Sequence, residues 1–422
     1  MFKNLRDRLR FARYTIVHRQ SLRAQKKWQE KKFTQLINRA YTNVPYWREL
    51  LKKAELLPKQ IHLSNLDVLP ITSKKTFLGK TPDEFTDNSR PLHSYWYLTS
   101  GSSGIPLTFL LSEQSLQARY SDFSSLRFLW WRGISPSEFA TINLARIRIR
   151  AKPSRHRLFV SVEDYCTNPR KEIAAMAAFK PVVVSTYPSL LLDMAQLVEK
   201  DPSVNLGGAQ FALSIGETLT PSVRKFISEK LKLEVYDRYG LEEIGVVGIE
   251  CAEHNGFHIN SESVFIEIVD DSGKRVKEGE EGRILATSLH NYEMPFIRYD
   301  SGDRGKMTSE PCACGLRSPR LWATGRFSIF LAFPHRRIHH LEFDGAMDGF
   351  MNEIFQYQIA KKSDTNIVAR IVPGPGFQQG TIEKVKNSLT SLVGSSISVE
   401  VELVEKVPIS ARGKCQIVVD ES

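Results

Sequence analysis

The chain has 422 residues, enough for two or three domains around sizeable hydrophobic cores. It contains no apolar run of about 18 residues that could span a membrane, and its first residues lack the apolar core of a signal peptide. Five cysteines in so long a chain do not resemble a disulfide framework, so we expect a protein of the reducing cytoplasm. The net charge of +11 is concentrated in one segment, which argues against a uniformly basic nucleic-acid-binding protein.

Residues 1–42 form this basic segment. Residues 1–32 hold eleven Lys or Arg against Asp7 and Glu30, and therefore carry nine of the eleven net positive charges. Apolar residues recur between the charges at roughly helical spacing, which predicts one or two helices. The first interpretation is that these helices pack on the body of the protein and leave one face solvated. The alternative is that the segment docks on an anionic membrane face, as a peripheral contact on the cytoplasmic side, or on an acidic partner.

The helical pattern breaks at Asn43–Trp47, where a proline precedes a short helix expected to reach Lys53. Further along, Thr99–Gly104 lies between two β-like runs, Tyr95–Leu98 and Leu107–Leu111. Two glycines and four hydroxyl residues make a poor helix or strand, but a flexible loop whose N–H groups and hydroxyls can surround phosphate oxygens. No Gly-Lys-Ser/Thr follows, which excludes a Walker A loop. A plain surface turn is the alternative.

From Tyr95 to about Lys232, β-like runs alternate with helical ones, which predicts a parallel α/β sheet. Ligands of such sheets bind at the carboxyl ends of the strands. Gly216-Glu217 and Tyr239-Gly240 both come just past predicted strand ends, as a binding site requires. The predicted elements are strands at 181–186, 211–215 and 234–236, and helices at 189–200 and 221–232.

Hairpin patterns replace this alternation in residues 258–325. Apolar strands at Val264–Val269 and Gly282–Leu289, with an Asp-Asp-Ser-Gly turn after the first, predict an antiparallel, barrel-like subdomain. Beyond it, a strand, a helix and a second strand predict a small α+β domain over residues 326–422. We therefore expect an α/β protein in which a large N-terminal domain of α/β sheets, residues 43–325, includes the barrel-like subdomain and precedes the small domain.

Metal-ligating residues flank the predicted hairpins. Cys251, His254 and His258 precede them, and Cys312 and Cys314 follow. Three thiols and one histidine are a usual tetrahedral zinc set, with His258 favoured over His254 as the fourth ligand. Cys-x-Cys is tighter than the common Cys-x2-Cys, so the spacing is only moderately specific. The alternative is a group of buried thiols beside a surface histidine.

Five motifs follow one another in the order of a known family. They are Thr99–Gly104, Tyr239–Glu243, Arg298–Asp303, Gly325-Arg326 and Arg412–Lys414. In this order the sequence resembles the adenylate-forming (acyl-CoA synthetase) superfamily, and specifically its phenylacetate–CoA ligase-like branch, which includes proteins linked to capsular polysaccharide synthesis. The resemblance runs from about Asn43 to Val419. Some members of this branch carry a structural zinc with cysteine and histidine ligands, which supports the zinc interpretation.

The resemblance implies that a substrate carboxylate attacks the α-phosphate of ATP and forms an acyl-adenylate and pyrophosphate. Lys414, on a mobile C-terminal domain, would reach the α-phosphate, and Glu243 would hold Mg²⁺. Tyr239 would stack on adenine, and Asp303 would accept hydrogen bonds from both ribose hydroxyls. The other implied nucleotide contacts are Thr99, Ser100, Gly101, Ser102, Ser103 and Gly104 around the β- and γ-phosphates, with Gly216, Glu217, Gly240 and Arg326 elsewhere on the nucleotide.

The sequence also departs from the family pattern. Glu242 stands where the family has Thr or Ser, and Thr218 stands where it has proline. After Gly325-Arg326, the family's hinge aspartate is replaced by Phe327–Leu331 and the basic run 334–340. Adenylation stays the expected first step, whereas the acyl acceptor is open: CoA or a carrier-protein thiol, or an amine or sugar in cell-surface polysaccharide biosynthesis. A third interpretation is a degenerate nucleotide-binding protein that acts as a membrane-associated assembly partner.

Overall fold

The computed structural model divides the chain into two compact units. The first comprises residues 1–138 and 236–326, and the second residues 139–235 and 327–422. In the part of the chain that the structure describes, no helix is long and apolar enough to cross a membrane. The described residues are 16–17, 19–78, 81–89, 94–98, 107–112, 141–145, 157–161, 164–165, 168–326, 330–334, 336–350, 353–374, 376–408 and 417–422.

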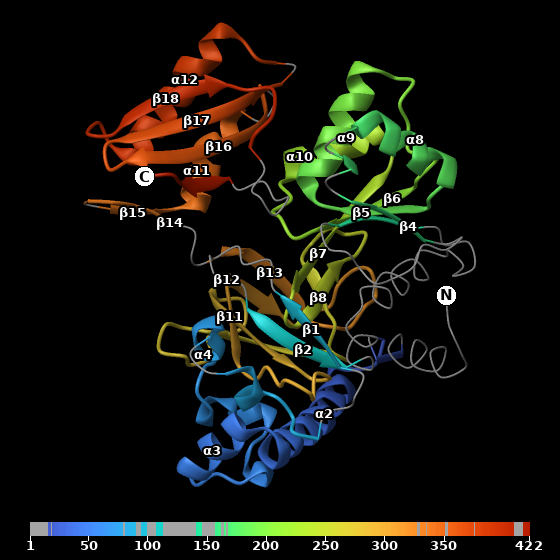
Figure 1. Cartoon of the computed structure of the whole chain (residues 1–422), viewed down its shortest axis with the longest axis vertical. Helices are drawn as coiled ribbons and strands as arrows, with labels where there is room; N and C mark the ends of the chain where they lie inside the picture. Colours follow the sequence, from blue (N-terminus) through green and yellow to red (C-terminus); the bar gives the residue numbers. More distant parts are fainter. Residues whose placement is uncertain are drawn as a thin grey trace. The chain divides into compact units, whose positions relative to one another are not determined.

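Helices open the first unit (Figure 1). α2 (Leu22–Asn43) begins where the Ser21 hydroxyl accepts a hydrogen bond from the N–H of Ala24, and α3 (Pro45–Lys53) begins at a proline that suits the first helical position. The helix predicted within the basic segment and the short helix ending at Lys53 are both confirmed. Short helices follow at η1 (Pro58–Gln60), η2 (Leu63–Val68), α4 (Lys74–Leu78) and η3 (Pro82–Phe85). Apolar side chains join α2 and α3 to the rest of the unit: Phe33, Leu36, Ile37, Ala40, Trp47, Leu51, Leu289 and Ile297.

Two antiparallel sheets complete the first unit. A hairpin pairs β1 (Ser94–Leu98) with β2 (Thr108–Ser112), and a larger sheet has the order β10-β11-β12-β13-β9-β8-β7. Phe109 of the hairpin shares one core with Ile266, Ile284 and Leu321 of the larger sheet. The antiparallel hairpins predicted after residue 257 are confirmed. The strands are β7 (Glu234–Leu241), β8 (Gly245–Glu250), β9 (Phe257–Ile259), β10 (Val264–Val269), β11 (Gly282–Ser288), β12 (Tyr299–Thr308) and β13 (Arg320–Arg326).

The first half of the second unit is a parallel α/β layer. Its strands have the order β6-β5-β3-β4 and pair in parallel, as the alternating pattern predicted. Buried residues of the strands and helices, such as Val184, Ala212, Leu191 and Ile227, form one core. The elements are β3 (Thr141–Ala145), β4 (Arg157–Ser161), α8 (Pro169–Phe179), β5 (Val183–Thr186), α9 (Pro188–Lys200), β6 (Phe211–Ile215) and α10 (Pro221–Leu231).

One strand boundary in this region was predicted wrongly. Tyr239 and Gly240 were expected just past a strand ending at residue 236, but they lie within β7. The strand continues because Arg238 and Tyr239 pair with Ile249 and Gly248 of the antiparallel neighbour β8. The apolar run that defined the predicted strand stops earlier, and hydropathy alone does not reveal such a partner.

The C-terminal part of the second unit has a core of its own. A four-stranded sheet of order β18-β17-β16-β19 packs with α12, and buried Ile359, Ile371, Val385 and Leu389 lie between them (Figure 1). The predicted strand–helix–strand pattern is confirmed here. The elements are β14 (Phe330–Phe333), β15 (Arg336–His339), α11 (His340–Met347), η5 (Asp348–Phe350), β16 (Ile354–Ser363), β17 (Asn366–Pro373), α12 (Gln379–Val393), β18 (Ser398–Leu403) and β19 (Val418–Asp420).

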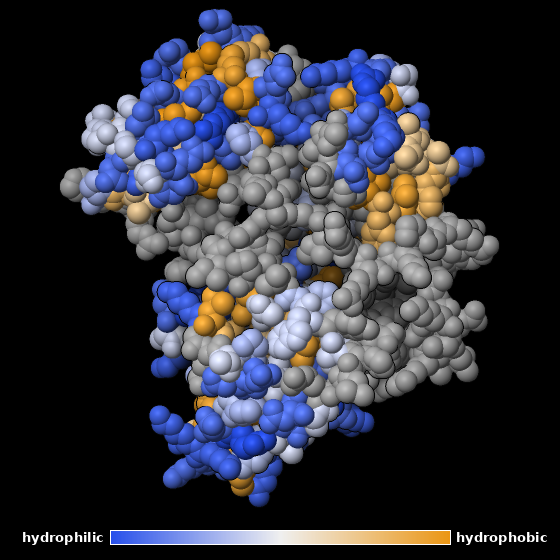
Figure 2. Space-filling model, viewed as in Figure 1, coloured by the Kyte–Doolittle hydropathy of each residue, from blue (hydrophilic) through white to orange (hydrophobic). Residues whose placement is uncertain are grey.

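The coloured surface in Figure 2 follows these cores. Around α3, at the foot of the view, hydrophilic residues predominate and apolar ones are scattered. This is the surface expected when the apolar faces of α2 and α3 are turned inward.

Candidate active site

Tyr239 and Asp303 meet within the first unit. The Tyr239 hydroxyl on β7 donates a hydrogen bond to Oδ2 of Asp303 on β12 over 2.6 Å. Asp303 is buried, with 5% of its surface exposed, whereas Tyr239 is half-buried. A buried carboxylate needs donors, and bonds to a charged acceptor are short. The structure therefore brings together the residues predicted to contact adenine and ribose, which lie 64 positions apart in the sequence.

A hydrogen-bonded turn holds the main chain of Asp303. Gly302 has a φ of +74°, in the left-handed region that favours glycine. The Ser301 hydroxyl accepts the N–H of Asp303 at 3.0 Å and donates to a main-chain carbonyl of β11 at 2.9 Å. Asp300 accepts the N–H of Gly302 at 3.0 Å and pairs with Arg283 at 2.6 Å. Ser301 and Arg283 were not singled out from the sequence, although Ser301 lies inside a recognised motif.

Arg298, the first residue of the same motif, has a structural position. It is 3% exposed, and its guanidinium donates to the carbonyls of Leu69 at 2.7 Å and Gly273 at 2.9 Å. Its Nε lies 3.4 Å from Oε2 of buried Glu267. Arg298 thus joins the segment before α4, the β10 hairpin and the start of β12.

Gly216 and Glu217 follow β6 in the second unit, as predicted. Gly216 has a φ of +73°, and the Glu217 carboxylate accepts the N–H of Ser189 at 3.0 Å and its hydroxyl at 3.1 Å. An acidic side chain at the first turn of a helix satisfies a free N–H and suits the helix dipole. Glu217 therefore joins the end of β6 to α9, a contact that the sequence pattern did not indicate.

Three other predicted positions lie close in sequence to these residues. Glu242 and Glu243 occupy the turn between β7 and β8, where Glu242 is exposed and Glu243 half-buried. Gly240 lies on β7, and the main chain of Arg326 ends β13 directly opposite Asp303 in the strand register. Their nucleotide contacts and the Mg²⁺ ligand stay predictions.

Two predicted parts of the site, Thr99–Gly104 and Lys414, lie outside the described residues. The strands that flank the loop are described, and Leu98 pairs with Thr108 across the β1–β2 hairpin. The Ser/Gly run thus falls in the connection of a hairpin, between two β-strands as predicted. Its contact with phosphate stays a prediction.

Cys251, His258, Cys312 and Cys314 converge in the first unit. Their ligand atoms all lie within 4.8 Å of one another. The Cys251 and Cys312 sulfurs are 3.7 Å apart, and the Cys314 sulfur lies 3.3 Å from Nε2 of His258. A tetrahedral zinc with sulfur ligands at about 2.3 Å spaces those sulfurs by about 3.8 Å. The donor set and its spacing therefore fit a four-coordinate zinc site.

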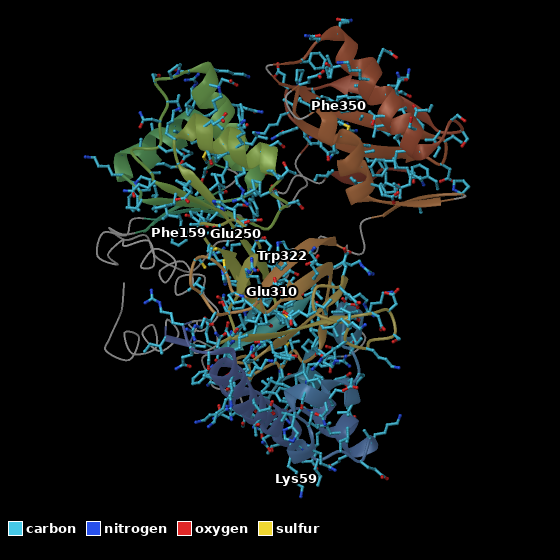
Figure 3. All side chains as sticks on the ribbon, turned by 180° about the vertical axis from the view of Figure 1, so that it is seen from behind. Lys59, Phe159, Glu250, Glu310, Trp322 and Phe350 are labelled. Atoms are coloured by element: carbon cyan, nitrogen blue, oxygen red, sulfur yellow. The ribbon has the colours of Figure 1, made fainter. Side chains whose placement is uncertain are left out.

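A hydrogen-bond partner orients the histidine of this cluster. Nδ1 of His258 lies 3.3 Å from the carbonyl oxygen and 3.2 Å from the hydroxyl of Ser318. A proton on Nδ1 would be donated to Ser318, which leaves the Nε2 lone pair facing the thiols. His254 lies outside the cluster, and its Nδ1 is 3.2 Å from Oε2 of Glu250. Figure 3 labels Glu250 and shows sulfur atoms near it. No sequence pattern pointed to Ser318.

Burial raises the pKa of the Cys251 and Cys314 thiols above their usual range, and the neighbouring Cys312 acts in the same direction. Without a cation these thiols would be protonated near neutral pH. A bound divalent cation reverses the balance, since a coordinating thiol is deprotonated.

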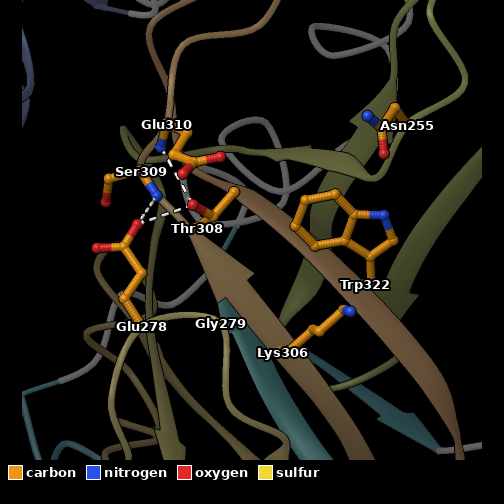
Figure 4. A pocket seen from close by; sticks show the side chains of 8 residues that line it. All are labelled: Asn255, Glu278, Gly279, Lys306, Thr308, Ser309, Glu310 and Trp322. Atoms are coloured by element: carbon orange, nitrogen blue, oxygen red, sulfur yellow. Dashed lines mark hydrogen bonds between the residues drawn. The ribbon is translucent and has the colours of Figure 1, made fainter.

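A polar cavity of about 720 Å³ lies beside β12 and β13 (Figure 4). Trp322 forms one wall, and the Glu278 carboxylate on the opposite wall accepts a hydrogen bond from the Thr308 hydroxyl at 3.0 Å. Of the residues predicted to bind nucleotide, none that the structure describes lines this cavity. The lining residues are Asn255, Glu278, Gly279, Lys306, Thr308, Ser309, Glu310 and Trp322.

The chain is similar to known proteins over most of its length, although no protein-family model matches it. A phenylacetate-coenzyme A ligase of Thermus thermophilus is 25% identical over 358 residues, covering 82% of this chain and 79% of its own. Protein CapK of Staphylococcus aureus is 20% identical and covers 92% of this chain and 87% of its own. A crystal structure of 2-hydroxyisobutyryl-CoA ligase in the postadenylation state, in complex with 2-HIB-AMP, matches with a TM-score of 0.76 at 19% identity, over 96% and 91% of the two chains.

The curated relatives and the fold shared with the ligase structure agree with the resemblance to the adenylate-forming superfamily and its phenylacetate–CoA ligase-like branch. The expected fold of this superfamily, a large α/β part with a small α+β part at the C-terminus, is confirmed. The contact between Tyr239 and Asp303 is the most informative one in the described structure, because it joins two of the five motifs.

Proposed function

We propose that this adenylate-forming protein activates a carboxylic acid with ATP and then transfers the acyl group to a thiol, in the first instance that of coenzyme A. A carboxylate oxygen of the acid attacks the α-phosphorus of ATP, the bond from that phosphorus to the bridging oxygen breaks, and pyrophosphate leaves with the electron pair. The thiolate of CoA then attacks the acyl carbon, and AMP leaves. The observation that carries the proposal is the hydrogen bond between Tyr239 and Asp303 in a fold shared with adenylate-forming ligases.

Each motif residue supplies one interaction in this proposal. The Tyr239 ring offers a face to adenine, and the buried Asp303 carboxylate offers acceptors to the ribose hydroxyls. Thr99–Gly104 would surround the departing pyrophosphate, and Lys414 would neutralise the charge that develops at the α-phosphate. Mg²⁺ favours few carboxylates together with phosphate oxygens, so the half-buried Glu243 carboxylate suits it; the ion would lower the repulsion between ATP and the incoming carboxylate.

The names of the relatives favour CoA as the acyl acceptor, and a second kind of acceptor is also considered. Four of the similar curated proteins are named phenylacetate-coenzyme A ligase, and one is Protein CapK. Transfer to an amine or sugar of a cell-surface polysaccharide, which the resemblance to the phenylacetate–CoA ligase-like branch implies, is the second candidate. Both acceptors use the same acyl-adenylate, so adenylation is tested first.

ATP–pyrophosphate exchange with a panel of carboxylic acids, including phenylacetate and 2-hydroxyisobutyrate, tests adenylation. We expect at least one acid to support exchange, and the same acid with CoA to give AMP and an acyl-CoA detectable by mass spectrometry. Exchange without CoA-dependent product would favour the amine or sugar acceptor. If ATP binds but no acid supports exchange, adenylation is contradicted and the degenerate nucleotide-binding interpretation is favoured.

We also propose that Cys251, His258, Cys312 and Cys314 hold a structural Zn²⁺. Four protein ligands leave no open coordination position, which is typical of structural rather than catalytic zinc. We expect about one zinc per chain in purified protein and a lower melting temperature after a strong chelator. Cys312→Ser should lose the zinc, whereas Cys166→Ser, which removes none of the four proposed ligands, should keep it. Less than about a tenth of an equivalent of zinc in the wild-type protein would end this proposal.

The basic N-terminal segment supports a proposed contact with anionic membranes. Arg23, Lys26, Lys27 and Lys31 are exposed on α2, whereas its opposite face is buried. Such a basic face is attracted to anionic lipid, with each charge contributing about 1 kcal/mol near the surface. We expect the protein to float with phosphatidylglycerol vesicles. The triple variant K26E, K27E and K31E should instead remain in the bottom fraction of the gradient. The matched pair K52E and K53E on α3 serves as control, and equal flotation of all three proteins would contradict the contact.

A further inference from the structure

Asp303 is held at both its main chain and its side chain. The Ser301 hydroxyl accepts its N–H, and the Tyr239 hydroxyl donates to its Oδ2. The second bond joins strands that are not neighbours, because β13, β9 and β8 lie between β12 and β7 in the sheet order. In a flat sheet four strand spacings amount to about 19 Å, further than these two side chains can reach. The sheet must therefore curve, and the hydrogen bond marks where its curvature brings β7 to β12.

The Tyr239 ring is itself held on β7. Tyr239 pairs with Gly248 of β8 in the strand register. Its ring lies 5.9 Å from the ring of Phe257 on β9, with 35° between the ring planes. A tyrosine ring has few rotatable bonds, so a packed ring gives its hydroxyl a well-defined position. The donor to Asp303 is thus fixed by contacts that do not depend on a ligand.

The hydrogen bond leaves the Asp303 carboxylate able to accept more. An ionised carboxylate has about four lone-pair positions, so the single bond from Tyr239 does not exhaust its capacity as an acceptor. Hydrogen bonds from ribose hydroxyls are therefore compatible with the bond from the tyrosine. A carboxylate whose rotation is already restricted also loses less conformational freedom when those hydroxyls arrive.

We propose that the Tyr239 hydroxyl is a positioning group that sets the ribose selectivity of this nucleotide site. It orients Asp303 toward the 2′- and 3′-hydroxyls, so that ATP is preferred over deoxynucleotides. This inference rests on the proposed function and adds to the predicted stacking of the ring on adenine, since it assigns a separate task to the hydroxyl. Recognition of a hydroxyl by an oriented buried acceptor discriminates strongly against an analogue that lacks it.

The test compares ATP with 2′-deoxy-ATP and 3′-deoxy-ATP in ATP–pyrophosphate exchange. Tyr239→Phe keeps the ring and removes only the hydroxyl. We expect the KM for ATP to rise about tenfold, which corresponds to the loss of one hydrogen bond to a charged group. The KM for 2′-deoxy-ATP should change less than about twofold, so the selectivity ratio collapses. Tyr292→Phe, whose hydroxyl lies 3.4 Å from Gln35 on α2, is the matched control and should keep the wild-type ratio.

Ser301→Ala gives a second route to the same measurement if Tyr239→Phe folds poorly. It should lower the same selectivity ratio by loosening the Asp303 main chain, and Ser301→Thr should restore it. A wild-type enzyme that exchanges with ATP and deoxy-ATP equally well, or variants that keep the wild-type ratio, would overturn the positioning proposal while leaving adenylation intact. A wild-type protein without any exchange would instead contradict the proposed function itself.

Discussion

Asp87 shows how a single buried charge anchors the segment that leads to β1. Its Oδ2 lies 2.6 Å from Nε of Arg39 on α2, and its Oδ1 accepts hydrogen bonds of 2.7 Å from both the N–H and the hydroxyl of Ser89. Burial opposes the charged form, but Arg39 and Ser89 outweigh it and hold the pKa of Asp87 below its usual value. The chain that continues into β1 and the predicted phosphate loop is therefore attached to α2.

We predict that Asp87→Asn lowers the free energy of unfolding by about 2 kcal/mol at pH 7, because hydrogen bonds to a charged group are lost. The pKa of Asp87 is lower in the folded than in the unfolded protein, where it is near 3.8. Its contribution is thus fully present above that value and is lost as the pH falls through the folded pKa. Urea unfolding at several pH values checks this, with exposed Asp83→Asn as control. A difference that stays constant down to pH 2 would contradict the prediction.

Among individual residues, the sequence motifs predicted the main contact of the candidate site but not the hydrogen bonds that support the site. Tyr239 and Asp303 were assigned to one ligand from the family pattern, and the structure brings them into contact. Ser318 beside His258 and Ser189 beside Glu217 were not foreseen. Serines are common throughout the chain, and only the tertiary fold selects which of them bond to distant residues.

Among the elements, the buried pair of Glu267 and Arg298 joins three segments of the first unit. Arg275 also contacts Glu267, at 3.0 Å, so one carboxylate on β10 serves two guanidinium groups. The carbonyl acceptors of Arg298 lie in different loops, at Leu69 and Gly273. The β10 hairpin and the start of β12 are therefore held to the segment before α4.

We predict that Arg298→Met destabilises the first unit by about 3 kcal/mol, because it leaves Glu267 short of a partner in a buried site. The matched control is Arg304→Met on β12, the strand that Arg298 precedes, because the ion pairs of Arg304 with Asp271 and Glu281 are more exposed. That change should cost less than about 0.5 kcal/mol. Urea unfolding followed by tryptophan fluorescence compares the two, and equal losses would argue against the importance of the buried pair.

Elements with a regular apolar pattern could be predicted from the sequence. The strand at Val264–Val269 and the helix ending at Lys200 match the structure, because their apolar faces are buried in a simple alternation or helical stripe. β7 was predicted too short, because its last residues are held by pairing with β8 rather than by burial. The curvature that brings β7 to β12 likewise depends on several strands together, and hydropathy carries no information about it.

For the whole molecule, the proposed reaction also uses Lys414, which lies far from Asp303 in the sequence and outside the described residues. We predict that Lys414→Ala lowers the rate of ATP–pyrophosphate exchange by about a hundredfold, comparable to the loss of one preorganised donor, with little effect on ATP binding. Lys386→Ala, an exposed lysine on α12 of the same C-terminal part, should exchange at the wild-type rate. Unchanged exchange in Lys414→Ala would remove this lysine from the mechanism.

The docking of α2 has a consequence for how the protein can be handled. Among the described strands, β10 lies at an edge of its sheet, and such an edge invites pairing with another chain. Gln29 donates to the carbonyl of Val264 on β10 at 2.9 Å, and the Trp28 indole donates to the carbonyl of Glu262 just before it at 3.2 Å. The helix thus protects the edge from aggregation. A truncated protein that lacks the basic segment would expose it and precipitate, so the segment is better studied by reversing its surface charges than by deleting it.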